Sequence, residues 1–200
     1  MGLGMICGID EAGRGPWAGP VIAAAVILDP KSPILGLADS KTLSHAQRQT
    51  LAANINRQAL TVGVGSASVA EIDSLNILRA TFLAMQRAVA ALGQQPGLAL
   101  VDGNQAPPLP CPVRTIIDGD ALEPAIGAAS IIAKVARDAL MDDLDRQYPD
   151  YHWARNKGYG TAAHRAALLR FGVTPHHRTS FKPVSHILCP AKGQTQPILR

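Results

Sequence analysis

The chain has 200 residues, of which 47% are hydrophobic and only 4% aromatic, and it carries a formal net charge of +4. This length fits one domain, and its core must be built from Ala, Val, Ile and Leu. The basic excess favours a polyanionic partner without establishing one. Cys7, Cys111 and Cys189 form no C-x-x-C pair, which predicts free thiols in a reducing compartment. No run approaches the ~18 apolar residues of a membrane span and no signal peptide is evident, so we expect a cytoplasmic protein with no membrane partner.

In chain order, the first predicted elements are two neighbouring strands joined by a loop rich in glycine and proline. Apolar or β-rich runs predict strands at residues 5–10, 21–28, 60–66, 98–102 and 113–117. Helical patterns, two of them opened by capping boxes at 44–47 and 68–71, predict helices at 44–57, from 68, and at 77–92, 122–147 and 161–170. The remainder, through Arg200, is expected to be irregular and basic. Early strands and late helices predict a mixed α/β core with a helical C-terminal part.

Four acidic residues stand where carboxylates are hard to keep. Asp10 and Glu11 end the first strand, Asp102 ends a later one, and Asp120 precedes the longest helix. Such carboxylates lose hydration and repel one another unless a cation neutralises them, and hard divalent ions such as Mg²⁺ or Mn²⁺ prefer oxygen ligands. Because adjacent strand residues point to opposite faces, Glu11 can join Asp10 only if the backbone turns there, and Gly13 would make that turn inexpensive.

Six motifs follow one another in an order that resembles the type 2 ribonuclease H family. They are Gly8-Ile9-Asp10-Glu11-Ala12-Gly13-Arg14-Gly15, Asp39-Ser40-Lys41, Val101-Asp102-Gly103-Asn104, Gly119-Asp120, the run from Ala128 to Lys134, and Lys157-Gly158-Tyr159. The resemblance covers roughly residues 5–182. It implies an RNase H-like fold with a mixed central sheet flanked by helices, a catalytic core over 1–145, and a C-terminal helical extension and tail over 146–200 of the same compact unit.

The resemblance also implies an activity and its residues. The activity is endonucleolytic cleavage of the RNA strand of RNA–DNA hybrids, and nicking on the 5′ side of single ribonucleotides in duplex DNA, with 3′-hydroxyl and 5′-phosphate products. It implies Mg²⁺ or Mn²⁺, two ions with substrate bound. The catalytic and metal-binding residues would be Asp10, Glu11, Asp102 and Asp120. The substrate-binding residues would be Gly13, Arg14, Gly15, Ser40, Lys41, Lys157 and Tyr159.

Other interpretations stay open at this point. A nuclease of the same fold acting on DNA alone, of resolvase or exonuclease type, is an alternative. Its DNA substrate, however, has no 2′-hydroxyl for the glycine loop, Gly13-Arg14-Gly15, to read. A non-catalytic hybrid-binding module is another. Lys134 and Arg137 are expected to be solvated i,i+4 partners of nearby acids, and Ser130 could be only a packing residue. The histidines are expected in loops or near phosphates. The tail over 183–200 could touch nucleic acid or a sliding clamp, but we expect it to be disordered, and we expect a monomer.

Overall fold

A mixed sheet forms the centre of the fold, with its strands in the spatial order β3–β2–β1–β4–β5. The strands are β1 (Ile6–Ala12), β2 (Val21–Ile27), β3 (Thr61–Ala67), β4 (Leu98–Asp102) and β5 (Val113–Ile116). Strand β1 pairs antiparallel with β2 and parallel with β4, while β5 pairs parallel with β4. The computed structural model describes residues 5–37 and 43–188 of the chain. Each predicted strand is present, so the mixed α/β class is confirmed.

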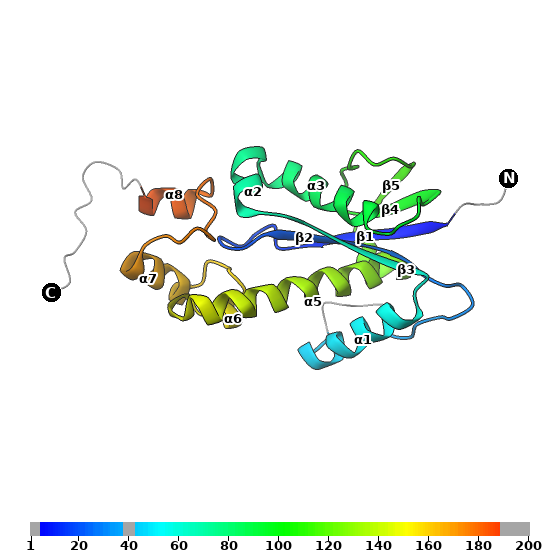
Figure 1. The fold of residues 1–200 in the computed structure, drawn as a ribbon, viewed down its shortest axis with the longest axis horizontal. Coiled ribbons are helices and arrows are strands. Elements are labelled where there is room, and N and C mark those ends of the chain that lie inside the picture. The colour runs from blue at the N-terminus through cyan, green and yellow to red at the C-terminus, as the bar shows by residue number, and fades with distance from the viewer. Residues whose placement is uncertain (1–4, 38–42, 189–200) are drawn as a thin grey trace.

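Helices cover both faces of this sheet (Figure 1). Helices α2 (Val69–Leu75) and α3 (Ile77–Ala90) lie on one face, and α1 (His45–Gln58) and α5 (Pro124–Gln147) on the other. Both interfaces are packed with Ala, Val, Ile and Leu side chains, as the low aromatic content predicts. Helix α5 approaches β1 so closely that a Cβ added to Gly8 would lie 2.0 Å from the carbonyl carbon of Ala125. Glycine at that position therefore brings the long helix against the strand that carries Asp10.

The two predicted capping boxes open α1 and α2. The Ser44 hydroxyl accepts a hydrogen bond from the Gln47 amide, and the Gln47 side chain accepts one from the Ser44 amide in return. Ser68 and Glu71 make the same reciprocal pair at α2. Each box satisfies backbone donors that a helix start leaves without intrahelical partners.

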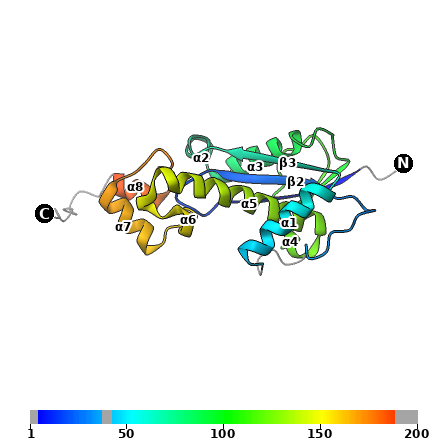
Figure 2. The ribbon, with the colours of Figure 1, turned by 60° about the horizontal axis from the view of Figure 1, so that its bottom comes forward.

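Beyond α5, a set of short helices packs around its C-terminal half (Figure 2). They are η1 (Pro149–Tyr151), α6 (Trp153–Asn156), α7 (Ala162–Phe171) and α8 (Lys182–Leu188). Their core contains Tyr151, Trp153 and Leu168 packed against Met141 of α5. Helix α7 was predicted and is confirmed. The predicted division at residue 145 stays a prediction, and α5 passes through that point without a break.

Two differences from the predicted elements are informative. The short helix α4 (Gly119–Leu122) precedes α5 and contains Asp120. The expectation of irregular structure beyond residue 172 is wrong at α8. The carboxylate of Asp73, from α2, accepts hydrogen bonds from the amides and hydroxyls of Thr179 and Ser180 at 2.6–3.0 Å. This contact across 106 residues orders the chain just before α8, and local sequence does not reveal it. Within the described ranges, no helix combines the length and apolar character needed to cross a bilayer.

Candidate active site

Two aspartates lie side by side where the parallel pairing of β1 with β4 ends. The register pairs Ile9 of β1 with Val101 of β4, so Asp10 and Asp102 occupy the next matched position. The Asp102 Oδ1 accepts a 2.8 Å hydrogen bond from the Gly119 amide at the start of α4. Asp120 follows on that helix and is buried, as is Asp10. The fold therefore brings three of the four predicted carboxylates to one end of the sheet.

The environment of Asp10 opposes its negative charge. Burial, and after it the nearby carboxylates of Glu11 and Asp102, raise the pKa of Asp10 from 3.8 to about 8. A hydrogen bond with Ser130 of α5 and a 2.7 Å bond from the Glu11 amide act in the opposite direction. Ser130 thus contacts the acidic group rather than serving only as a packing residue. A cation beside Asp10 would remove most of this electrostatic cost.

Glu11 does not join Asp10 through a backbone turn. Strand β1 continues through Ala12, with Glu11 paired opposite Ala23, and the turn comes afterwards at Gly13, whose φ is +98°. Because strand side chains alternate, Glu11 leaves the sheet on the other face from Asp10. Its carboxylate pairs with the Arg14 guanidinium at 3.1 Å. Burial raises the pKa of Glu11, and the pairing with Arg14 acts against this rise. The Asp102 carboxylate also raises the pKa of Glu11, so Glu11 and Asp102 still interact.

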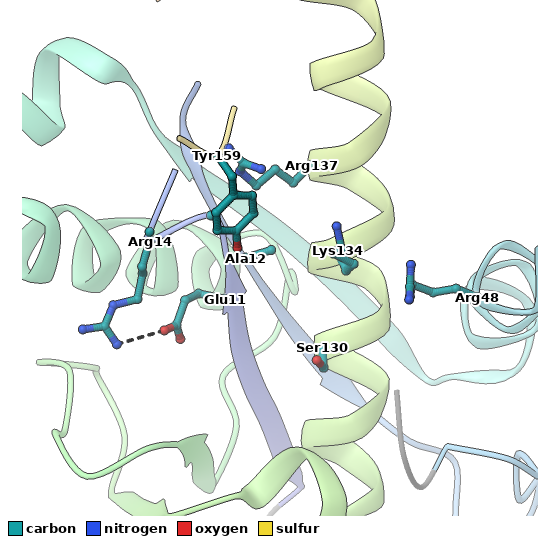
Figure 3. A pocket seen from close by; sticks show the side chains of 10 residues that line it. Glu11, Ala12, Arg14, Arg48, Ser130, Lys134, Arg137 and Tyr159 are labelled. Carbon is teal, nitrogen blue, oxygen red and sulfur yellow. Dashed lines mark hydrogen bonds and ion pairs between the residues drawn. The ribbon is translucent and has the colours of Figure 1, made fainter. Parts of the chain in front are cut away.

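A cavity of about 450 Å³ is lined by Glu11 (Figure 3). Its positive side chains belong to Arg14, Arg48, Lys134 and Arg137. The rest of its wall includes Glu11, Gly13, Gly15, Ser130 and Tyr159. Glu11 also lines a smaller hollow of about 50 Å³ that reaches Asp102 and helix α3. The cavity is therefore mostly basic and touches the acidic group through Glu11 and Ser130, which suits an anionic ligand approaching bound cations.

The glycine loop (Gly13–Gly15) and Tyr159 lie next to each other in the wall of this cavity. Tyr159 is half exposed, and a Cβ added to Gly15 would lie 3.4 Å from its ring. A Cβ on Gly13 would overlap the Arg137 guanidinium, at 2.0 Å from Nε. Arg137 therefore occupies the space beside Gly13, whereas the space beside Gly15 adjoins the ring of Tyr159. Arg14, between them, has a half-exposed side chain.

Tyr159 is held from behind by two buried histidines. The Nδ1–H of His164 donates to the Tyr159 carbonyl oxygen at 2.9 Å, and its Nε2 accepts from the indole of Trp153 at 3.2 Å. This assigns the tautomer of His164, and His177 must then donate to the same Nε2 at 3.0 Å. The expectation that most histidines lie in loops or near phosphates is wrong for His164, which lies on α7, whereas His177 does lie in the connection between α7 and α8; both are buried.

The basic residues of helix α5 divide into two kinds. Lys134 pairs with Asp138 at 2.5 Å, as the i,i+4 expectation predicts, and also lines the cavity. Arg137 is not a solvated partner. It is 1% exposed, and its guanidinium donates to the carbonyl oxygens of Ala18, Pro20 and Lys157 at 2.9–3.1 Å.

Two predicted groups of residues lie apart from the cavity or outside the described chain. The ammonium of Lys157 pairs with the Asp142 carboxylate, and Lys157 is absent from the described cavity lining. Its main chain takes part instead, since its carbonyl accepts from Arg137. Ser40 and Lys41 fall outside the described residues. Within the described ranges, no three Asp, Glu, His or Cys side chains are drawn together closely enough to enclose a metal ion.

Comparison with known proteins identifies the family of this chain. The family model described as ribonuclease HII matches residues 7–184. The chain is 62% identical to a ribonuclease HII of Bordetella avium, in an alignment that covers 90% of this chain and 89% of the relative. It is 57% identical to a ribonuclease HII of Paramagnetospirillum magneticum, with 92% of this chain and 94% of the relative covered.

Solved structures agree with this assignment. The ribonuclease H2 of Pyrococcus horikoshii superposes with a TM-score of 0.77 at 26% identity, covering 91% of this chain and 96% of the other. The ribonuclease HII in a complex with PCNA from Archaeoglobus fulgidus gives a TM-score of 0.77 at 27% identity, covering 89% and 95%. The RNase H-like fold is therefore confirmed. This chain belongs to the ribonuclease HII family, and it is a type 2 ribonuclease H, a divalent-metal-dependent phosphodiester endonuclease.

Proposed function

We propose that the protein hydrolyses the RNA strand of RNA–DNA hybrids and nicks duplex DNA on the 5′ side of single embedded ribonucleotides. The products would carry 3′-hydroxyl and 5′-phosphate ends. One observation carries the proposal: a basic cavity joins the acidic end of the sheet to a glycine loop that lies next to an exposed tyrosine. The acidic end of the sheet and the basic cavity suit phosphodiester hydrolysis, and the glycine loop with the tyrosine suits recognition of a sugar.

The acidic residues fit a divalent metal by chemistry and charge. Their donors are all carboxylate oxygens, which Mg²⁺ and Mn²⁺ prefer, and burial together with Glu11 and Asp102 raises the pKa of Asp10, which a bound cation would lower. We assign Asp10 and Asp102 as the principal ligands, with Glu11 and Asp120 completing the shells. The protein need not enclose the ions alone, because Mg²⁺ keeps waters and takes phosphate oxygens. Two bound ions would supply an activated water and stabilise the leaving 3′-oxygen.

The residues around the cavity would orient the nucleic acid. Lys134 and Arg48 supply positive charge to the wall that phosphates would follow, and Arg14 supplies it beside Glu11. Ser40 and Lys41 are proposed as further phosphate contacts on the family resemblance alone. The main chain of Gly13, Arg14 and Gly15 would test the 2′-hydroxyl, which is the group that separates RNA from DNA.

Tyr159 would complete the recognition of the sugar. Its half-exposed ring offers a flat face to a sugar or base at the ribonucleotide junction. Gly15 leaves the space beside the ring open.

A cleavage assay on three labelled duplexes tests the proposal. The duplexes would contain one ribonucleotide, an RNA–DNA hybrid, or DNA only, each with Mg²⁺ or Mn²⁺ and with excess chelator. We expect cleavage of the first two, a cut 5′ of the lone ribonucleotide, and no cleavage in chelator. Equal cleavage of the all-DNA duplex would favour a DNA nuclease of this fold. Binding without turnover, unaffected by Asp10→Asn, would favour a non-catalytic hybrid-binding module.

A sliding clamp is a further proposed partner. The Archaeoglobus fulgidus relative has been solved as a PCNA complex. In this chain the tail after α8 would be the contact, and the protein would act as a monomer. Light scattering of the full chain, alone and mixed with a clamp, would measure both; deletion of residues 189–200 should abolish any complex without lowering basal cleavage.

A further inference from the structure

Arg178 is a fully buried arginine whose guanidinium is directed at the glycine loop. Its Nη2 donates to the Gly13 carbonyl oxygen at 2.6 Å, and its Nη1 donates to the Arg14 carbonyl oxygen at 2.9 Å. Nε and Nη2 also donate to the Gly19 carbonyl oxygen, at 2.9 and 2.8 Å. One side chain from the C-terminal segment thus ties both ends of the loop that follows β1.

This arginine makes no ion pair among the described residues. Its charge is satisfied by main-chain carbonyls and by the ring of Phe181, whose centroid lies 5.1 Å from the guanidinium carbon. Burial and the neighbouring Arg137 lower the pKa of Arg178 to about 9, so it keeps its charge at neutral pH. A buried charge requires partners of fixed geometry, because each lost hydrogen bond leaves an unsatisfied donor. The loop carbonyls are those partners.

Peptide geometry then dictates where the loop amides point. The described chain has no cis peptide bond, and in a trans peptide the N–H points opposite to the C=O of the same unit. The Gly13 and Arg14 carbonyls both point at one guanidinium, so the Arg14 and Gly15 amides must both point away from it. Within the described chain neither amide donates to a protein acceptor, and both residues are exposed and line the cavity. Two successive amides directed to the same side form a binding point for an electronegative atom.

We propose that Arg178 is a positioning residue for sugar recognition, which turns the Arg14 and Gly15 amides into the cavity so that they donate to the 2′-oxygen of the ribonucleotide. The inference rests on the proposed function, because it deepens the role given there to the glycine loop. Arg178 itself touches no substrate. Replacing it would release the two carbonyls and let the amides rotate out of line.

The test compares cleavage of two duplexes that differ only at one 2′ position, hydroxyl or fluorine, for the wild type and Arg178→Met. Fluorine is a much weaker hydrogen-bond acceptor than a hydroxyl oxygen. We expect the variant to lose about 100-fold in kcat/KM on the hydroxyl substrate, as for a misplaced binding group, and far less on the fluoro substrate. The preference for hydroxyl over fluorine should therefore collapse. Arg87→Met is the matched control, since Arg87 also donates to a carbonyl, that of Ser66, but lies on α3 away from the cavity lining.

A merely structural role predicts a different result. Loss of folded enzyme would lower both rates by the same factor and leave the preference unchanged, which would overturn the proposal. Partial recovery of the preference in Arg178→Lys, which keeps one donor group, would support it. If the wild type fails to cleave the hydroxyl duplex at all, the proposed function fails and not the role of Arg178.

A second measurement needs no variant at Arg178. Amide resonances of Arg14 and Gly15 in ¹⁵N-labelled wild type would be followed while the single-ribonucleotide duplex or its all-DNA counterpart is added, with Ca²⁺ in place of Mg²⁺. We expect both amides to shift with the ribonucleotide duplex and to respond much less to the all-DNA duplex. Identical responses to the two duplexes would overturn the proposal even if Arg178→Met does not fold.

Discussion

Replacing Asp10 by asparagine should stabilise the metal-free protein at neutral pH while nearly abolishing cleavage. The carboxylate lies in a buried position where burial, Glu11 and Asp102 raise its pKa to about 8. In the unfolded chain the same group ionises near 3.8. Between these values the folded protein holds a proton that the unfolded chain releases, so stability falls as the pH rises through this window. Asparagine carries no charge and avoids this loss.

The size of the effect follows from the difference in pKa. Each pH unit between the two values contributes about 1.4 kcal/mol, so the penalty at pH 7 is about 4 kcal/mol. Asparagine keeps an oxygen for the 2.7 Å hydrogen bond from the Glu11 amide. Its new NH₂ group needs a partner, which costs about 1 to 3 kcal/mol when one is lacking. The net gain in free energy of unfolding is therefore about 1 to 3 kcal/mol at pH 7. Near pH 4 the titration penalty is absent, so the variant should instead be less stable than the wild type by about 1 to 3 kcal/mol.

Thermal and urea unfolding in excess chelator at pH 5 and pH 8 would measure this gain. For a chain of this size it corresponds to a rise in Tm of about 3 to 10 °C at pH 8, and less at pH 5. Adding Mg²⁺ or Mn²⁺ should stabilise the wild type more than the variant, because a bound ion stabilises only the state that binds it. The same preparations would be assayed for cleavage and for hybrid binding, which should remain measurable in the variant.

The opposite order of stabilities would refute the reasoning. If Asp10→Asn unfolds more readily than the wild type in chelator at pH 8, the carboxylate is a structural hydrogen-bond partner and not a repelled metal ligand. Glu71→Gln is a useful contrast. Hydrogen bonds with Arg87 and Ser68 lower the pKa of the Glu71 carboxylate, so the charged form stabilises the fold and Glu71→Gln should destabilise the protein.

The remaining predictions concern the cavity and its support. Arg14→Ala should lower kcat/KM on a single-ribonucleotide duplex but change the free energy of unfolding by less than about 1 kcal/mol, because its ion pair is half exposed; parallel losses of both would contradict this. Tyr159→Ala should lower cleavage of that duplex about tenfold while Tyr159→Phe should not, since the ring is what stacks; equal rates for the two variants would remove the proposed role. Burial lowers the pKa of His177 to about 3, so the contribution of this residue to stability should fall as the pH drops below 6.5, and the free energy of unfolding of His177→Gln relative to the wild type should rise between pH 7 and pH 4 in urea titrations. Hybrid affinity should weaken as salt rises, because phosphate contacts release counterions, and a flat profile would argue against a basic binding face.

Local signals in the sequence predicted most of the framework. Serine with Gln or Glu three residues later identified the starts of α1 and α2, because the capping box is a local hydrogen-bonding pattern. Apolar runs identified the strands, since β2 is buried along its whole length. Helices α4, α6 and α8 and the 3₁₀ turn η1 were missed. Helices α4 and α6 have only four residues each and η1 has three, while α8 depends on Asp73, far away in the chain.

The candidate site was predictable where a residue type already suggested its chemistry. Asp10, Asp102 and Asp120 lie at the same end of the sheet, because strand ends and a following helix start are fixed by local pattern and parallel pairing. Their role as shared metal ligands stays a prediction. Glu11 differed because β1 runs two residues beyond Asp10, and strand pairing with β2 decided that length. Lys157 differed because its ammonium found Asp142 on α5. The direction of the Glu11 side chain and the ion pair of Lys157 both depend on tertiary contacts, which no sequence motif predicts.

The arginines and histidines behind the cavity show why such support escapes sequence reasoning. Arg137, Arg178 and His164 all bind main-chain carbonyl oxygens, which every residue carries, so their partners leave no trace in side-chain spacing. An acidic neighbour on the same helix made Arg137 look like an ordinary surface partner, yet it is buried against the glycine loop. The C-terminal segment is therefore more than an appendage to the sheet. It supplies Arg178, which lies 165 positions after Gly13 in the chain. Loss of Arg178 should therefore disorder the glycine loop, although the two are far apart in sequence.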